Sequence, residues 1–150
     1  MASMIVAVLA LLLTGALAGL FYAFSMSVMP ALDAVEPAQA EAVMRSINRK
    51  ILNPWLFLPF FGSWLLSGAA GVLRLTAGEP AGFFLAAAGV TFVGAFLSTI
   101  VVNVPMNNAL DAGERSWSAY SPRWTLWNTS RTIACLISLG LLGAGLITWN

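Results

Sequence analysis

Four long apolar stretches alternate with shorter polar ones along this chain of 150 residues. A membrane-spanning helix needs about 20 consecutive, mostly apolar residues. The stretches at residues 4–29, 55–75, 81–104 and 125–149 meet this requirement. The pattern therefore predicts an all-α membrane protein, a four-transmembrane-helix bundle that forms a single domain over residues 1–150.

The first polar segment, residues 33–53, predicts a short amphipathic helix on the membrane surface between the first two spans. Its apolar residues recur at helical spacing, and they are Ala40, Val43, Met44, Ile47 and Ile51. Pro37 suits the first turn of such a helix, where a missing N–H is tolerated. The second polar segment, residues 105–124, is expected to be a loop on the same side of the membrane.

Composition supports the membrane assignment and excludes other classes of protein. Hydrophobic residues make up 59% of the chain and charged residues 9%, whereas soluble domains average about 25% charged residues. The net charge of +1 argues against a nucleic-acid partner, which requires a basic surface. Membrane lipid is the expected partner, and whether the bundle forms a homo-oligomer stays open.

The chain contains no histidine and a single cysteine, Cys135, which lies inside an apolar stretch. Histidine is the commonest protein metal ligand, the usual haem ligand and the commonest general base. One cysteine cannot form an internal disulfide, and Cys135 is predicted to be a small buried hydrophobe. We therefore expect neither a metal nor another cofactor.

The distribution of lysine and arginine predicts the orientation in a cell membrane. The two polar segments hold Arg45, Arg49, Lys50, Arg115 and Arg123. The opposite side holds only Arg74, whose side chain is expected to reach the lipid headgroups. The positive-inside rule then places both polar segments in the cytoplasm and both termini outside.

Polar side chains gather at residues 103–131, between the third and fourth apolar stretches. The unusual ones for a membrane protein are Asn103, Asn107, Asn128 and Arg131. Asn128 and Arg131 lie three residues apart and share a helix face, as do Trp124 and Trp127. Amide donors, a guanidinium and flat aromatic walls suit a planar, oxygenated, apolar ligand. An aromatic belt with amides that cap helix ends is the alternative.

Three further side chains are candidates for contact with such a ligand. Tyr22 and Ser25 share a face near the end of the first apolar stretch. They either face a ligand cavity, or lie at the membrane interface with the serine bonded to its own helix. Asn48 lies near the apolar side of the amphipathic helix, where an amide must find a partner or be buried at a cost.

Four segments carry a resemblance to a known family, and they follow the order of the spans: GLFYAFSMSVMPAL, MRSINRKILNPWLF, NVPMNNAL and WTLWNTSR. On these segments the chain resembles the anthrone-oxygenase-like family of small membrane proteins. The resemblance implies a four-helix membrane protein and, in the characterised branch, cofactor-free oxidation of an anthrone to an anthraquinone by O2. The family's polar signature falls on Asn48, Asn103, Asn107, Trp124, Asn128 and Arg131.

The resemblance makes this chain a candidate monooxygenase that acts on a planar phenolic substrate. An anthrone has an acidic CH2 group opposite its carbonyl, and the enolate formed by its deprotonation can reduce O2 directly. We expect Arg131 and Asn128 to donate hydrogen bonds to the enolate oxygen. A further amide, from Asn103 or Asn107, is expected to assist.

The remaining roles fall to aromatic residues and carboxylates. Trp124 and Trp127 are expected to stack on the rings of the substrate. The base is expected among the carboxylates nearest the span ends, Asp33 and Asp111. The alternative is a non-catalytic protein that binds or passes a hydrophobic compound or serves as a subunit. An ion channel or proton pump is disfavoured because no charged residue lies in the middle of a predicted span.

Overall fold

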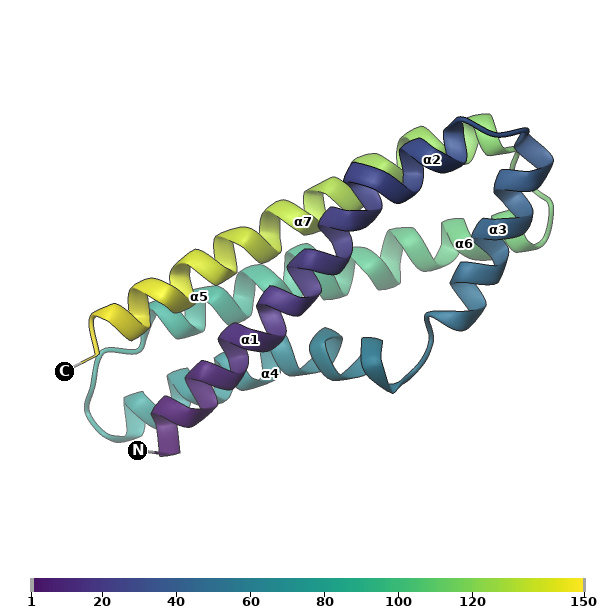
Figure 1. Ribbon diagram of the computed structural model, residues 1–150. Coiled ribbons are helices and arrows are strands. Elements are labelled where there is room, and N and C mark those ends of the chain that lie inside the picture. The colour runs from purple at the N-terminus through teal and green to yellow at the C-terminus, as the bar shows by residue number, and fades with distance from the viewer. Residues whose placement is uncertain (1, 150) are drawn as a thin grey trace.

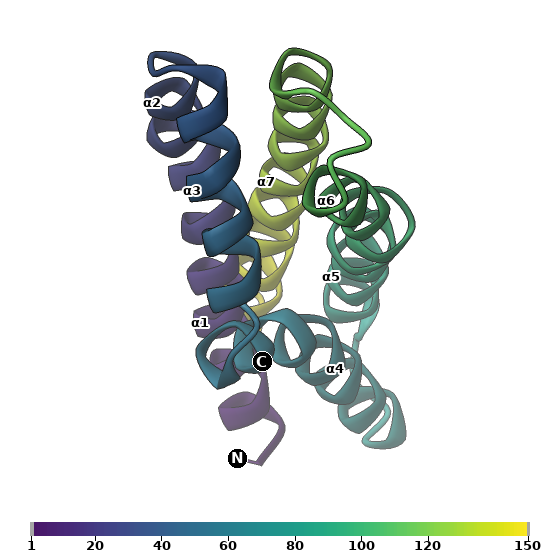
Figure 2. The ribbon, with the colours of Figure 1, turned by 90° about the vertical axis from the view of Figure 1, so that its right-hand side faces the viewer.

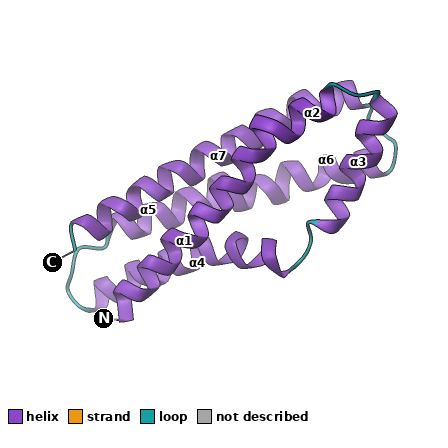
Figure 3. Cartoon of the chain, viewed as in Figure 1, coloured by secondary structure: helices purple, strands orange, loops and turns teal. Residues whose placement is uncertain are grey.

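The computed structural model describes residues 2–149, and every regular element in that range is a helix (Figure 3). Four helices are long and apolar enough to cross a membrane: Ala2–Asp33, Pro54–Thr76, Gly82–Asp111 and Trp117–Ile147. They pack lengthwise into an elongated bundle, and the chain enters and leaves it at the same end (Figure 1). The predicted all-α, four-span membrane fold is confirmed.

The first and third spanning helices each contain π-helical turns. The first consists of α1 (Ala2–Ala23), a π-helical segment (Phe24–Val28) and α2 (Met29–Asp33). The third consists of α5 (Gly82–Thr91), two π-helical segments (Phe92–Leu97 and Thr99–Asn103) and α6 (Val104–Asp111). A proline cannot pair with the carbonyl four residues before it. For Pro30 and Pro105 that carbonyl lies in a π-helical segment. In such a segment each carbonyl accepts a hydrogen bond from the N–H group five residues later, so it does not need the missing N–H of the proline. Each helix therefore continues through its proline.

The helices extend further into the polar segments than hydropathy predicted. The first and third helices were predicted to end at residues 29 and 104, but they continue to Asp33 and Asp111. The fourth helix, α7 (Trp117–Ile147), begins at Trp117 rather than at residue 125. Hydropathy predicts only the length of helix that lies in lipid. A helix continues beyond that length where one of its faces is packed against the protein, and the buried Trp117 shows such packing at the start of α7. The second polar segment is therefore mostly helical, and residues 112–116 form its loop.

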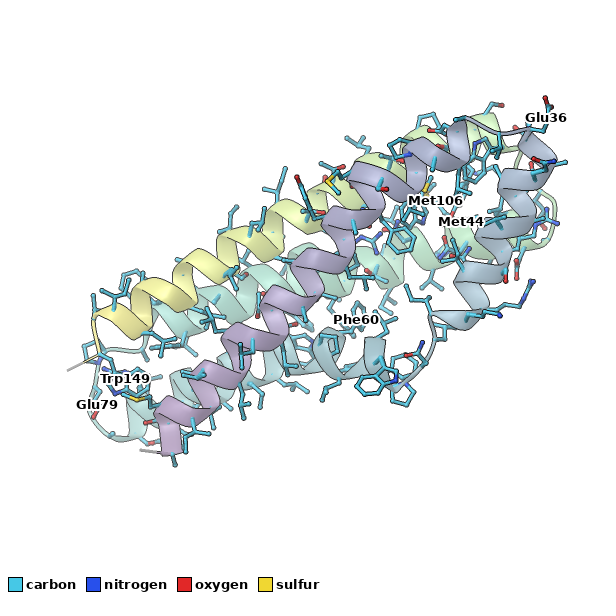
Figure 4. The ribbon with its side chains drawn as sticks, viewed as in Figure 1. Glu36, Met44, Phe60, Glu79, Met106 and Trp149 are labelled. Atoms are coloured by element: carbon cyan, nitrogen blue, oxygen red, sulfur yellow. The ribbon has the colours of Figure 1, made fainter. Side chains whose placement is uncertain are left out.

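The amphipathic helix predicted from the first polar segment is present as α3 (Pro37–Lys50), with Pro37 in its first turn. It crosses the end of the bundle opposite the chain termini, and Figure 2 looks onto this end. Met44 of α3 is fully buried and packs in one apolar cluster with Met106 of α6 (Figure 4). The apolar side of α3 is thus docked on α6 and α7, and both polar connections lie at one end of the bundle as predicted.

Three residues separate the end of α3 from the second spanning helix, α4 (Pro54–Thr76). The Asn53 side chain caps it by accepting hydrogen bonds from the backbone N–H groups of Trp55 and Leu56, at 2.9 and 3.3 Å. Along its length α4 packs mainly against α1 and α5. Its first turns make few contacts with the segment Thr99–Asn103 or with α6, and this leaves room inside the bundle at that level.

The end of the bundle near the chain termini is closed by Arg74 at the C-terminal end of α4. Its side chain was expected to reach the headgroups, but it is only 2% exposed. Its Nε donates a hydrogen bond to the carbonyl of Pro80 at 2.7 Å, and its Nη1 lies 3.2 Å from the Glu79 carboxylate. The guanidinium also lies 4.1 Å from the ring centroid of Trp149, and Figure 4 shows Glu79 and Trp149 together at this end. Arg74 thus binds groups of the protein rather than lipid headgroups. Its contacts connect the turn after α4 to Trp149, which follows α7.

Candidate functional site

A cavity of about 140 Å³ lies inside the bundle, on the side of α3. A single water needs only about 10–15 Å³ of such space, so the cavity is large enough for a larger ligand. It is lined mainly by apolar side chains, among which Phe60 points inward from α4 (Figure 4). The exposed side chains of Phe57, Ile100 and Val104 belong to its wall. They place its opening on the flank of the bundle, between α4 and the third spanning helix.

Arg131 is the charged residue of this cavity, and its side chain enters from α7. The residue is 4% exposed. Its guanidinium donates hydrogen bonds to the hydroxyl of Thr99 at 2.9 Å and to the side-chain oxygen of Asn128 at 3.0 Å. It also lies 4.5 Å from the ring centroid of Phe21 and 5.4 Å from that of Trp124. These contacts hold the guanidinium at the polar wall of an otherwise apolar space.

No carboxylate from residues 2–149 forms an ion pair with Arg131. Its Nε, although buried, has no hydrogen-bond partner in that range either. A buried cation without a counter-ion destabilises a fold, because neutral hydrogen bonds and aromatic rings replace only part of its hydration. The arrangement therefore offers a positive charge and a free N–H group to an anionic or strongly polarised oxygen in the cavity.

Asn128 fixes the position of Arg131 and links α7 to the first spanning helix. Its amide group donates hydrogen bonds to the carbonyl of Phe21 at 2.6 Å and to the hydroxyl of Ser25 at 2.7 Å. Its oxygen accepts the hydrogen bond from Arg131, and Ser25 also bonds to Thr129 at 2.9 Å. Both amide N–H groups of Asn128 are thus used within the protein. It lines the cavity, but it is placed to position Arg131 rather than to donate to a ligand.

Asn103 differs from Asn128 although both are buried asparagines in the cavity wall. It ends the π-helical segment of the third spanning helix and is 1% exposed. Neither its side-chain oxygen nor its side-chain nitrogen has a hydrogen-bond partner among residues 2–149. Because such groups are almost always paired in folded proteins, the Asn103 amide is the side chain best placed to bind the polar groups of a ligand.

Replacing Asn103 by leucine is expected to raise the stability of the ligand-free protein. An unsatisfied buried polar group costs about 1–3 kcal/mol, and leucine removes that cost while it keeps the branched shape of the side chain next to a cavity that can take its larger methyl groups. Thermal unfolding in detergent should show a higher midpoint for Asn103→Leu. The neighbouring Asn108 is exposed, so Asn108→Leu serves as the matched control and should change the midpoint little. A lower midpoint for Asn103→Leu would mean that the amide is satisfied within the folded protein.

Asn107 and Asn48 complete the polar wall of the cavity. The oxygen of Asn107 accepts hydrogen bonds from the hydroxyl of Tyr120 at 2.8 Å and from Nε1 of Trp124 at 3.0 Å. Asn107 therefore fixes the ring of Trp124, one of the predicted stacking residues, against the cavity. Asn48 reaches the cavity from α3 and joins the amphipathic helix to the site.

Three of the predicted ligand contacts lie outside the cavity. Trp127 is half-buried and does not line the cavity, although it lies only three residues from Trp124, which does. Tyr22 is 53% exposed on the outer surface of the first spanning helix. Ser25 is not in the cavity wall, and its contribution is the hydrogen bond that it accepts from Asn128. The structure therefore leaves Trp124 as the tryptophan that can contact a ligand in this cavity.

The two carboxylates predicted as bases also lie outside the cavity. Asp33 accepts hydrogen bonds from Nε1 of Trp117 at 2.8 Å and from the hydroxyl of Ser121 at 2.6 Å. Asp111 lies 3.6 Å from the guanidinium of Arg49, and it lines a separate outer hollow. Both side chains sit beyond the cavity end of their helices, because these helices continue past the predicted span ends. No Asp or Glu belongs to the wall of the cavity formed by residues 2–149.

Sequence patterns did not single out Thr99 and Phe21, which both hold the Arg131 guanidinium. Thr99 lies four residues before Asn103 and so on the same helix face. That spacing was a usable signal, but a threonine in an apolar helix usually bonds to its own backbone. Phe21 gave no signal, since nothing distinguishes it from the other phenylalanines before the fold is known. Among residues 2–149 no three His, Cys, Asp or Glu side chains come together as a metal site.

Comparison with known proteins bears on the same part of the chain. The family model described as anthrone oxygenase matches residues 55–141, which is more than half of the chain. The matched range includes the polar residues of the cavity wall other than Asn48, namely Thr99, Asn103, Asn107, Trp124, Asn128 and Arg131. Searches of curated proteins and of solved structures gave no significant match. The chain belongs to the anthrone oxygenase family.

Proposed function

We propose that this membrane protein oxidises a planar phenolic, anthrone-like substrate with O2, without a cofactor, in the cavity beside Arg131. The observation that carries the proposal is the buried Arg131 guanidinium, which has no ion-pair partner among residues 2–149 and an unused Nε. An enolate or phenolate oxygen is the natural partner for such a group. The apolar walls and the ring of Trp124 suit the flat remainder of the substrate.

The proposed reaction converts a ring CH2 group into a carbonyl. Loss of one proton from the CH2 gives an enolate, whose oxygen binds Arg131. The enolate gives an electron to O2, and the resulting radical pair combines to form a C–O bond and, after protonation, a hydroperoxide at that carbon. Loss of water from the hydroperoxide leaves the second carbonyl. One atom of O2 enters the product and the other leaves as water, so the four electrons lost by carbon are those that O2 accepts.

The protein in this proposal supplies electrostatic stabilisation rather than a carboxylate base. The cavity wall within residues 2–149 contains no Asp or Glu, and water at its opening is the proposed proton acceptor. Arg131 acts by stabilising the enolate, which makes the substrate a stronger acid within the cavity. Activity should therefore follow the ionisation of the substrate rather than that of Asp33 or Asp111.

The test is oxygen uptake by purified protein in detergent with a simple anthrone under ¹⁸O2. The proposal expects turnover above the uncatalysed rate, with one ¹⁸O atom per molecule of quinone and one in water. Asp33→Asn and Asp111→Asn are the matched variants, and each should change the rate by less than about twofold, since neither carboxylate lines the cavity. A loss of about 100-fold or more in either variant would identify that carboxylate as the base and overturn the water-based step.

A non-catalytic protein that binds a hydrophobic compound is the second candidate, because the same cavity and unpaired amide suit binding alone. The two functions separate in one experiment. If the anthrone raises the unfolding temperature but oxygen uptake does not exceed the uncatalysed rate, the protein is a binding protein for such compounds.

We also propose that the end of the bundle covered by α3 faces the cytoplasm. The exposed basic side chains Arg49, Lys50 and Arg123 lie at this end, and the positive-inside rule favours it there. A cysteine introduced at Glu114, in the short loop before α7, should react with a membrane-impermeant maleimide in inside-out vesicles but not in intact cells. Cys135 is fully buried and should contribute little background. Labelling in intact cells would reverse the orientation.

A further inference from the structure

A second hollow of about 220 Å³ lies on the outer surface, between the third spanning helix and the start of α7. Its lining residues are Val101, Val102, Pro105, Met106, Arg115 and Arg123. On the third spanning helix these positions neighbour the stripe of Ile100, Asn103, Val104 and Asn107, which lines the internal cavity. The hollow is therefore separate from the candidate oxygenase site and shares no lining residue with it.

The hollow combines two cations with an apolar floor. Arg115 precedes α7 and Arg123 lies in its second turn. Neither guanidinium forms an ion pair or a side-chain hydrogen bond with any residue in the described range 2–149. Arg115 has Glu114 as its chain neighbour, and the two still form no ion pair. Two like charges beside one hollow repel each other, so a shared anion would stabilise the arrangement.

The apolar part of the hollow continues along the third helix into the region predicted to be in lipid. Val101 is 68% exposed and lies at the edge of the hollow, whereas Met106 is buried at its floor. A ligand that fits both parts carries an anionic group at one end and an extended hydrocarbon chain at the other. Phospholipids with a net negative charge have this form, and basic pockets between membrane helices bind them.

We propose that this hollow binds an anionic phospholipid of the surrounding bilayer. Arg115 and Arg123 bind the phosphodiester, since guanidinium groups form paired hydrogen bonds with phosphate oxygens. An acyl chain lies along Val101 and Val102, in the groove between the third spanning helix and α7. The site is independent of the oxidation proposed above and stands whether or not the protein turns over a substrate.

The test is a titration of fluorescent phosphatidylglycerol into the full-length protein in neutral detergent. The double variant Arg115→Gln, Arg123→Gln should bind about 25-fold more weakly, roughly fivefold for each arginine beside an anionic headgroup. Lys50→Gln removes one exposed cation of the same end, outside the hollow, and should change the affinity less than about twofold. Thermal unfolding of each variant confirms that the fold is retained.

Two further probes separate the lipid from its headgroup. Phosphatidylcholine should bind much more weakly than phosphatidylglycerol, and inorganic phosphate should neither compete at equal concentration nor raise the unfolding temperature. Equal binding by the double variant, or equal binding by the zwitterionic lipid, overturns the proposal. Competition by phosphate alone would show a simple anion site without a lipid.

Discussion

Replacing Arg131 by methionine is expected to slow the proposed oxidation by about 100- to 1000-fold, the usual loss for one donor to a developing oxyanion. The same change should leave the unfolding temperature unchanged or raise it, because it removes a buried charge that has no ion-pair partner among residues 2–149. Methionine is flexible and can pack between the rings of Phe21 and Trp124. Oxygen uptake and thermal unfolding, measured on the same preparation, check both halves of this prediction.

A slower oxidation together with an unchanged or higher unfolding temperature distinguishes an arginine that acts in the reaction from one that stabilises the fold. If Arg131 mainly held the bundle together, Arg131→Met would unfold at a lower temperature, and its loss of activity would follow from its loss of fold. Arg131→Lys is the conservative control: it keeps the charge but not the planar group that reaches both Thr99 and Asn128. It should recover part of the rate. A stable Arg131→Met protein with the full rate would remove Arg131 from the mechanism.

Replacing Asn128 by leucine is expected to destabilise the protein by about 3 kcal/mol, since it removes three hydrogen bonds to other residues and each contributes about 1 kcal/mol. Leucine would leave the carbonyl of Phe21, the hydroxyl of Ser25 and one N–H of Arg131 without their present partner. The unfolding midpoint in detergent should fall clearly below that of the wild type. This is the opposite of the result expected for Asn103→Leu, although both residues are buried asparagines in one cavity wall.

The comparison of the two asparagines has its own control. Ser25→Ala removes one of the two acceptors of Asn128 while the carbonyl of Phe21 remains, so it should cost about 1 kcal/mol. If Asn128→Leu is no less stable than Ser25→Ala, the link between α7 and the first spanning helix contributes little to stability.

Hydropathy was sufficient to predict the four spans, because lipid imposes both a length and a composition on each of them. It could not predict where the helices end. Beyond the lipid, Trp117 and the residues around it stay helical because they pack against α3 and α2. These are tertiary contacts, which cannot be predicted from the local sequence pattern. Pro30 and Pro105 each follow directly on a predicted span end, at residues 29 and 104, and π-helical turns carry both helices through these prolines.

The candidate site could be predicted in part, because polar and charged residues are rare in an apolar chain and therefore indicate a possible site. Arg131, Asn103, Asn107 and Asn128 stand out as polar residues near span ends, and Asn48 stands out as an amide near the apolar side of the amphipathic helix. All five line one cavity. Their separate roles were not predictable, since only the fold shows that Asn128 is fully paired and Asn103 is not. Asp33 and Asp111 were predicted as candidate bases because they are the carboxylates nearest the span ends in sequence. That distance does not indicate the direction in which a side chain points.

The π-helical segment Thr99–Asn103 sets the rotational phase of the third spanning helix. An α-helix turns by about 100° per residue, and a π-helical turn holds an additional residue relative to it. Deleting one residue from this segment would restore an α-helix whose two flanks keep nearly their present orientation, because the π-helical turn already absorbs the additional residue. An α-helical turn of unchanged length would instead rotate the part before the segment against the part after it by about that angle. Asn103 and Asn107 could then no longer face the cavity together with the side chains that precede them. A related chain that keeps the length of this helix but loses the π-helical turn would thus have a different polar wall, although its hydropathy profile is almost the same.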